Sequence, residues 1–98
     1  IMKISEMDKN CDEVVEILKA LAHKQRLMIL CHLSEGEKTV SELHELCNLS
    51  NSYTSQFLKR MKREGLVDSN REGNFTYYKL TDPKVEKLIK SLHLIFSV

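Results

Sequence analysis

The clearest chemical signal in the sequence lies between residues 50 and 63, where short polar side chains are followed by a group of cations. Asn51 and Gln56 carry amides, which can pair bidentately with adenine in the major groove of DNA. Ser52 and Ser55 add hydroxyl groups, and the cations that follow are suited to backbone phosphates. Those cations are Lys59, Arg60, Lys62 and Arg63. The order predicts a helix that reads base edges with its first turns and meets phosphates further along.

Residues that could support catalysis or metal binding are sparse. The sequence has no Gly-rich phosphate loop, no Ser/His/Asp arrangement with a nucleophile turn and no convincing carboxylate pair, so we predict no enzymatic activity and no cofactor. His44 and Cys47 are spaced i, i+3 and could share a helix face and a borderline metal ion. Two ligands do not make a site, and Cys47 as a small core residue with His44 at the surface is the simpler interpretation. We therefore predict no metal site.

A DNA-reading helix needs a second, short helix in front of it to set its angle. The stretch from Thr39 to Glu42 has the T-x-x-E pattern of a capping box, so a helix is predicted to begin there with Leu43 and Leu46 facing inward. Ser50 is a good N-cap for the reading helix, and Gly65 is well placed to end it. The buried side of the reading helix is predicted to hold Thr54, Leu58 and Met61.

A β-hairpin is predicted after the reading helix. Residues Leu66 to Ser69 lead into a turn from Asn70 to Asn74, in which Gly73 supplies conformational freedom. Phe75 to Leu80 is rich in aromatic and β-branched residues and predicts the second strand.

Three more helices complete the prediction. They cover residues 8–22 and 24–33 and a last helix that opens with Asp82 as N-cap and Pro83 at its first position. The last helix has more apolar positions than a lone surface helix needs: Val85, Leu88, Ile89, Leu92, Ile95 and Phe96. We therefore expect a homodimer formed through the first and last helices. The fold class is mainly α with a β-hairpin wing, a winged helix-turn-helix in one domain over residues 1–98, with four helices, two strands and a final helix in order.

Charge is distributed unevenly. The net charge is +1, yet residues 1–18 hold two lysines against five acids, and residues 50–80 hold six basic groups against three acids. One face can thus be offered to phosphates while another does different work. Every hydrophobic segment is interrupted by charges, so no membrane span is predicted. Three cysteines without a CxxC pair favour the reducing cytoplasm.

Several segments together resemble the ArsR/SmtB family of repressors. They are 22–30 (AHKQRLMIL), 40–43 (VSEL), 49–58 (LSNSYTSQFL), 64–67 (EGLV) and 77–80 (YYKL). The resemblance covers nearly the whole chain and implies a dimeric winged helix-turn-helix repressor that releases its double-stranded operator when a ligand or oxidant arrives. Three positions depart from the family pattern: Lys24 stands where Pro is frequent, Tyr53 where a small residue is usual, and Phe57 where His is common.

The resemblance also implies roles for residues. Groove contacts would come from Asn51, Ser52, Ser55 and Gln56, with Tyr53 beside them. Phosphate contacts would come from Lys59, Arg60, Lys62 and Arg63, and Arg71 with Asn74 would form the tip of the wing. Phe57 is expected to pack inward and to re-aim the reading helix slightly.

The segment from Arg26 to Leu33 resembles the BigR/HlyU-like sulfide- and redox-sensing branch of the family. That branch has a cysteine at the position of Cys31 and a second one close to the C-terminus, where this chain has Ser97. Cys11, on the first helix, is the candidate replacement for the missing thiol. The resemblance thus implies an inducer that is a reactive sulfur or oxidant species, acting on Cys31 and Cys11. The competing interpretation is that Cys31 is a buried apolar residue.

Two alternative functions stay open from the sequence. One is a metal-responsive repressor of the same family, although the third helix begins with Lys38-Thr39-Val40 and no thiol, and His93 has no partner at ligand spacing on the last helix. The other is a winged-helix module for protein–protein contact. The cations of the reading helix disfavour the second, because a protein-binding surface would present exposed apolar anchors.

Overall fold

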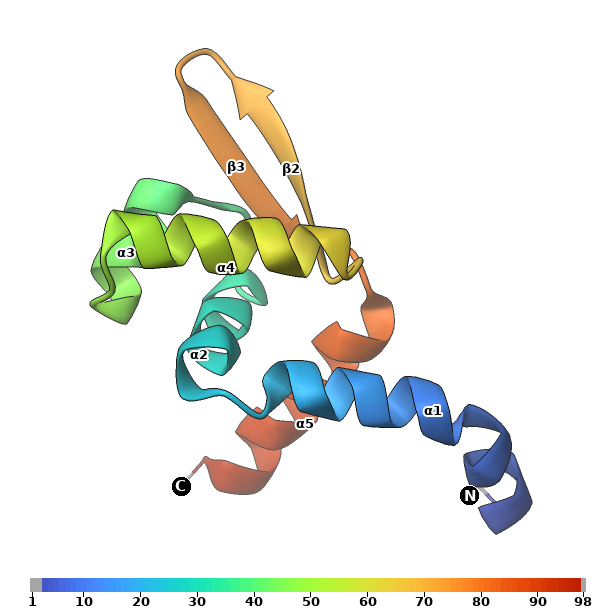
Figure 1. Cartoon of the computed structure of the whole chain (residues 1–98). Helices are drawn as coiled ribbons and strands as arrows, with labels where there is room; N and C mark the ends of the chain where they lie inside the picture. Colours follow the sequence, from blue (N-terminus) through green and yellow to red (C-terminus); the bar gives the residue numbers. More distant parts are fainter. Residues whose placement is uncertain (1–2, 98) are drawn as a thin grey trace.

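The computed structural model describes residues 3–97 and contains five helices and three strands over that range. The elements are α1 (Ile4–Leu21), α2 (Lys24–Leu33), β1 (Lys38–Thr39), α3 (Val40–Cys47), α4 (Asn51–Arg63), β2 (Val67–Glu72), β3 (Phe75–Leu80) and α5 (Pro83–Phe96). In Figure 1, α4 lies across α2 and α3, the β2–β3 hairpin rises beyond it, and α1 and α5 lie on the other side of α2. Within residues 3–97, no helix is both long and apolar enough to cross a bilayer.

The predicted mainly helical fold with a hairpin wing is confirmed, with one change at the start of the chain. Helix α1 begins at Ile4, not at Asp8. Residues 3–13 are all exposed, so the early turns carry no buried stripe from which hydrophobic periodicity could have located them. Good helix formers such as Glu6, Met7 and Lys9 continue the helix without burial.

The sheet differs from the prediction in two ways. It has three antiparallel strands in the order β1-β3-β2, because Lys38 pairs with Tyr78 and Thr39 with Tyr77. A strand of two residues carries no detectable alternation, so the sequence gave no signal for it. The hairpin is also longer than predicted: β2 continues through Glu72, which pairs with Phe75, and only Gly73 and Asn74 form the turn. Gly73 takes a φ of 62°, which glycine adopts without steric cost.

Local capping fixes the two helices of the helix-turn-helix. Thr39 Oγ1 accepts from the backbone N–H of Glu42 at 3.1 Å, and the Glu42 carboxylate accepts from the N–H of Thr39 at 2.9 Å. These bonds hold the pKa of the Glu42 carboxyl below its usual value. Helix α3 ends on Asn48 in the left-handed conformation, and Ser50 caps α4 through the N–H of Tyr53 at 3.1 Å. The predicted capping box and N-cap are therefore confirmed.

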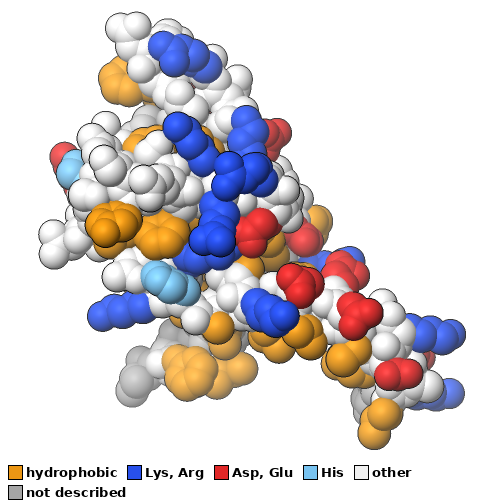
Figure 2. Space-filling view, viewed as in Figure 1, with side chains coloured by type: hydrophobic (Ala, Val, Ile, Leu, Met, Phe, Trp, Pro, Cys, Tyr) orange, Lys and Arg blue, Asp and Glu red, His pale blue; other side chains and the backbone are white. Residues whose placement is uncertain are grey.

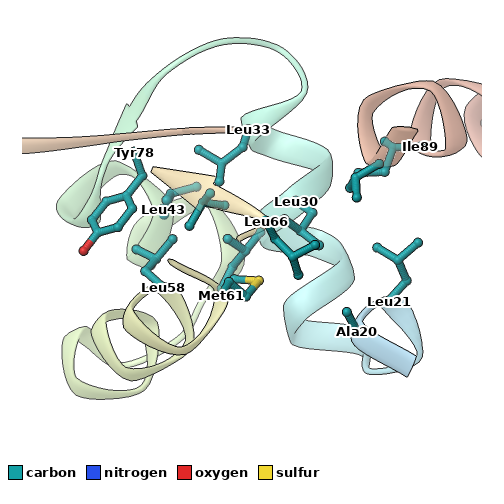
Figure 3. Packing of buried hydrophobic residues seen from close by; sticks show 13 residues of the cluster. Ala20, Leu21, Leu30, Leu33, Leu43, Leu58, Met61, Leu66, Tyr78 and Ile89 are labelled. Carbon is teal, nitrogen blue, oxygen red and sulfur yellow. The ribbon is translucent and has the colours of Figure 1, made fainter. Parts of the chain in front are cut away.

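The core joins all five helices to the sheet. In Figure 3, Leu43, Leu58 and Tyr78 lie at one end, Ala20, Leu21 and Ile89 lie at the other, and Leu30, Met61 and Leu66 lie between them. Thr54, Leu58 and Met61 are fully buried, which confirms the predicted inner side of α4. The prediction for Leu46 was wrong: it is half exposed, because α3 turns Leu43 and Cys47 toward the core and Leu46 away from it.

Candidate nucleic-acid interface

The outer face of α4 is built by the periodicity of the helix. Ser52, Gln56, Lys59 and Arg63 follow one another at i, i+4, i+7 and i+11 and are all exposed. They lie opposite the fully buried Thr54, Leu58 and Met61, so packing of the inner side fixes which way the outer side points. A shallow hollow at the start of this face is lined by Val40, Asn51, Ser52, Ser55, Gln56 and Lys59. The predicted base-reading residues are thus gathered on one surface.

One flank of α4 meets the wing. Lys62 Nζ donates to Ser69 Oγ of β2 at 2.7 Å. Arg71, two residues further along β2, lies on the same side of the hairpin as Ser69 and is exposed. Asn74 is exposed in the turn at the wing tip. In Figure 2, Lys and Arg side chains form a band over α4 that extends toward the hairpin, whereas Asp and Glu side chains gather along α1.

The other flank of α4 faces the start of α2. The ring of Phe57 lies 5.4 Å from that of His23, centroid to centroid, and 6.4 Å from that of Tyr53. At the far end of α4, Arg26 Nη2 donates to Glu64 Oε1 at 2.6 Å, with the Arg26 side chain only 12% exposed. Phe57 is half-buried in this contact, as the inward packing predicted for it requires. His23, Arg26 and Glu64 were missed as elements of the site, although the i, i+4, i+7 and i+11 spacing of residues 53, 57, 60 and 64 marks a stripe.

Apolar surface is exposed on the opposite side of the molecule. Leu94, Ile95 and Phe96, in the last turn of α5, are 83%, 70% and 77% exposed. Helices α1 and α5 enclose a groove of about 370 Å³ whose apolar lining is Val14, Ile17, Leu18 and Leu88. An ion pair between Lys84 and Glu13 joins the two helices beside this groove and raises the pKa of the Lys84 ammonium.

The three cysteines are free thiols in different settings. Cys11 is exposed on α1, whereas Cys31 and Cys47 are half-buried against the core. Burial, and then the charge of Glu35, raises the pKa of the Cys31 thiol. Burial, and then the neighbouring Cys31, raises the pKa of Cys47. The proximity of Cys47 to Cys31 had no signal in the sequence, because it depends on how α3 packs on α2.

The His44–Cys47 pair has a structural use for its histidine. His44 Nδ1 lies 2.8 Å from the carbonyl oxygen of Leu49, in the turn between α3 and α4. Over residues 3–97, no three side chains of the metal-ligating types come together. The surface position predicted for His44 is partly correct, since the residue is half-buried.

Comparison with known proteins gives a consistent result. Residues 23–69, from the start of α2 into β2, match the family model for bacterial regulatory proteins of the arsR family. The transcriptional activator HlyU of Vibrio cholerae is 39% identical over 95 residues, which cover 97% of this chain and 88% of that protein.

Solved structures agree with the sequence comparison. The transcriptional repressor BigR of Xylella fastidiosa superposes with a TM-score of 0.94 at 35% identity, covering 99% of both chains. A homodimeric winged helix-turn-helix DNA-binding domain of Mycobacterium bovis superposes with a TM-score of 0.76 at 31% identity, covering 90% of this chain and 82% of that one. The winged helix-turn-helix predicted from the sequence is therefore confirmed.

Proposed function

This chain belongs to the ArsR family of bacterial regulatory proteins and is a DNA-binding transcriptional regulator, and from that premise we propose that it is a repressor that inserts α4 into the major groove of its operator. The observation that carries the proposal is the outer face of α4, where the exposed Ser52 and Gln56 precede the exposed Lys59 and Arg63. Hydroxyl and amide groups can read base edges, and the cations can meet the flanking phosphates. Asn51, Ser55, Arg60 and Lys62 would add contacts at the edges of this face, with Arg71 and Asn74 on the wing.

The binding unit we propose is a homodimer. The exposed last turn of α5 and the apolar groove between α1 and α5 lie on the side away from α4, where a second copy would cover them. The M. bovis domain of the same fold is itself homodimeric. A two-fold dimer presents two α4 helices, so the operator should be an inverted repeat with half-sites one helical turn, about 10 base pairs, or a multiple of it apart.

Binding to promoter DNA at graded salt tests this function. We expect a gel shift with DNA from beside the protein's own coding region and a much weaker shift with a scrambled duplex. If all four α4 cations of both protomers met phosphates, the logarithmic salt slope would approach about −7, and we expect a slope of several negative units. A slope near zero, or equal affinity for operator and scrambled DNA, would contradict the proposal. Lower transcription from the operator promoter in the protein's presence is the result expected of a repressor.

For the inducer, we propose a reactive sulfur or oxidant species that acts on Cys31, with Cys11 as the second thiol. The support is positional: Cys31 lies on α2, the helix whose His23 and Arg26 contact the flank of α4. A chemical change that shifts α2 could therefore alter how α4 is held.

The raised pKa of Cys31 leaves little thiolate at neutral pH, so we expect its reaction to accelerate as pH rises toward and beyond 9. Mass spectrometry of peroxide- or polysulfide-treated protein at several pH values, paired with operator affinity, measures this. The Cys31→Ser variant should keep its affinity under treatment, and Cys11→Ser shows whether the second thiol takes part. Unmodified Cys31 together with unchanged affinity of the treated wild type would remove the inducer proposal and leave DNA binding intact.

A further inference from the structure

Three aromatic rings form a continuous row from the start of α2 to the start of α4. His23, the N-cap residue of α2, lies against Phe57 with a tilt of 56° between the rings. Phe57 in turn stacks on Tyr53 with an interplanar angle of 26°. Because Tyr53 and Phe57 are i, i+4 on one helix, the stack follows from the helix geometry itself. The row supports the Tyr53 ring from one side only.

The row cannot rotate away from α2, because α4 is held on the same flank at a second point. Tyr53, Phe57, Arg60 and Glu64 form one stripe along α4, and Glu64 accepts from the largely buried Arg26. Two contacts, His23 with Phe57 and Arg26 with Glu64, therefore set the angle of the stripe. Arg60 is exposed on that stripe, between the two contacts.

Tyr53 has the properties of a pre-positioned donor. Its side chain is 61% exposed although one ring face is covered by Phe57. Within residues 3–97, its backbone N–H is bonded to Ser50, but its hydroxyl donates to no protein acceptor. An unbonded phenol on a rigid ring, in line with an exposed arginine, suits a phosphate oxygen, and tyrosine hydroxyls are common phosphate donors in DNA complexes.

We propose that the Tyr53 hydroxyl donates a hydrogen bond to a backbone phosphate on the α2 flank of α4, and that Phe57 is the residue that positions it. This rests on the proposed function, and it assigns a role to that flank. The DNA backbone is then held on both sides of the recognition helix. Lys62 and Arg71 act on the wing side, and Tyr53 and Arg60 act on the α2 side.

The direct test removes only the hydroxyl. Tyr53→Phe should weaken binding about tenfold, since a hydrogen bond to a charged acceptor is lost. The loss should be equal on operator and scrambled duplexes, because a phosphate contact carries no sequence information. The salt slope should stay unchanged, since no charge is removed. Tyr77→Phe, which deletes a hydroxyl from β3, is the matched control.

Methylphosphonate scanning locates the contact. Replacing one phosphate at a time by a neutral methylphosphonate should reveal one position per half-site at which wild type is weakened much more than Tyr53→Phe. The positioning role is tested separately: Phe57→Leu should erase this difference, and Phe57→Tyr, which keeps a ring for stacking, should restore it. Thermal unfolding of Phe57→Leu shows whether the fold is intact, and the Tyr53→Phe result does not depend on that variant.

The outcomes separate this inference from the proposed function. If wild type prefers its operator but Tyr53→Phe binds equally well, or changes the preferred base sequence, the phosphate contact is wrong and the function stands. A lack of any position that distinguishes wild type from Tyr53→Phe in the scan would also overturn the inference. If wild type itself shows no operator preference and no salt dependence, the proposed function fails first.

Discussion

Replacing Leu94, Ile95 and Phe96 together by serine is expected to convert the protein into a monomer and to lower its operator affinity by about 10² to 10⁴-fold, the gain that linking two binding modules provides. These side chains are exposed at the end of α5, so their removal costs the isolated fold little. In a dimer they would be covered, and each serine would leave apolar partner surface exposed to water. Analytical ultracentrifugation and a gel shift on the same samples measure the two effects.

A matched control keeps this result specific. Leu46→Ser changes another half-exposed apolar residue, on α3, and should leave both the mass and the affinity near those of wild type. If the triple variant sediments as a dimer, the end of α5 is not the dimer contact. If it is a monomer with full operator affinity, dimerisation does not contribute to DNA binding.

Replacing Lys59 and Arg63 by glutamine is expected to have the second large effect. Both side chains are exposed on the outer face of α4, opposite its buried side. A dimer loses two cations from each protomer, so the salt slope should become less negative by about 3.6. Near 0.15 M salt this corresponds to an affinity loss on the order of a thousandfold on operator and scrambled DNA alike.

The control for this variant removes the same charge elsewhere. Lys87 and Lys90 are exposed on α5, and their replacement by glutamine should leave the salt slope unchanged. Fluorescence anisotropy over a range of salt concentrations gives both slopes. Equal slope changes in the two variants would mean that DNA responds to net charge and does not lie on α4.

Sequence and structure agree best where a local signal sets an element. The Thr39 capping box, the Ser50 N-cap and the Asp82 N-cap all occur as predicted, because each depends on side chains within three residues of the helix start. Burial of Thr54, Leu58 and Met61 was predictable from helical periodicity, and so was the outward direction of Ser52 and Gln56.

The differences arise where the determining contact is remote or too short to leave a pattern. Strand β1 exists because Lys38 and Thr39 pair with residues near the end of β3. The Arg26–Glu64 ion pair spans 38 residues, and the ring contact of His23 with Phe57 spans a similar distance along the chain. Helix packing creates these contacts, and no residue spacing in one segment can reveal them. The α2 flank of the interface therefore had to be found in three dimensions.

The most direct test of the central claim, that the outer face of α4 lies on operator DNA, is an amide chemical-shift map of the ¹⁵N-labelled protein as operator duplex is added. We predict the largest changes at residues 51–63 of α4 and at 71–74 of the wing, with small changes along the acidic first half of α1. Largest changes on α1 or α5, with the amides of α4 unmoved, would contradict the account.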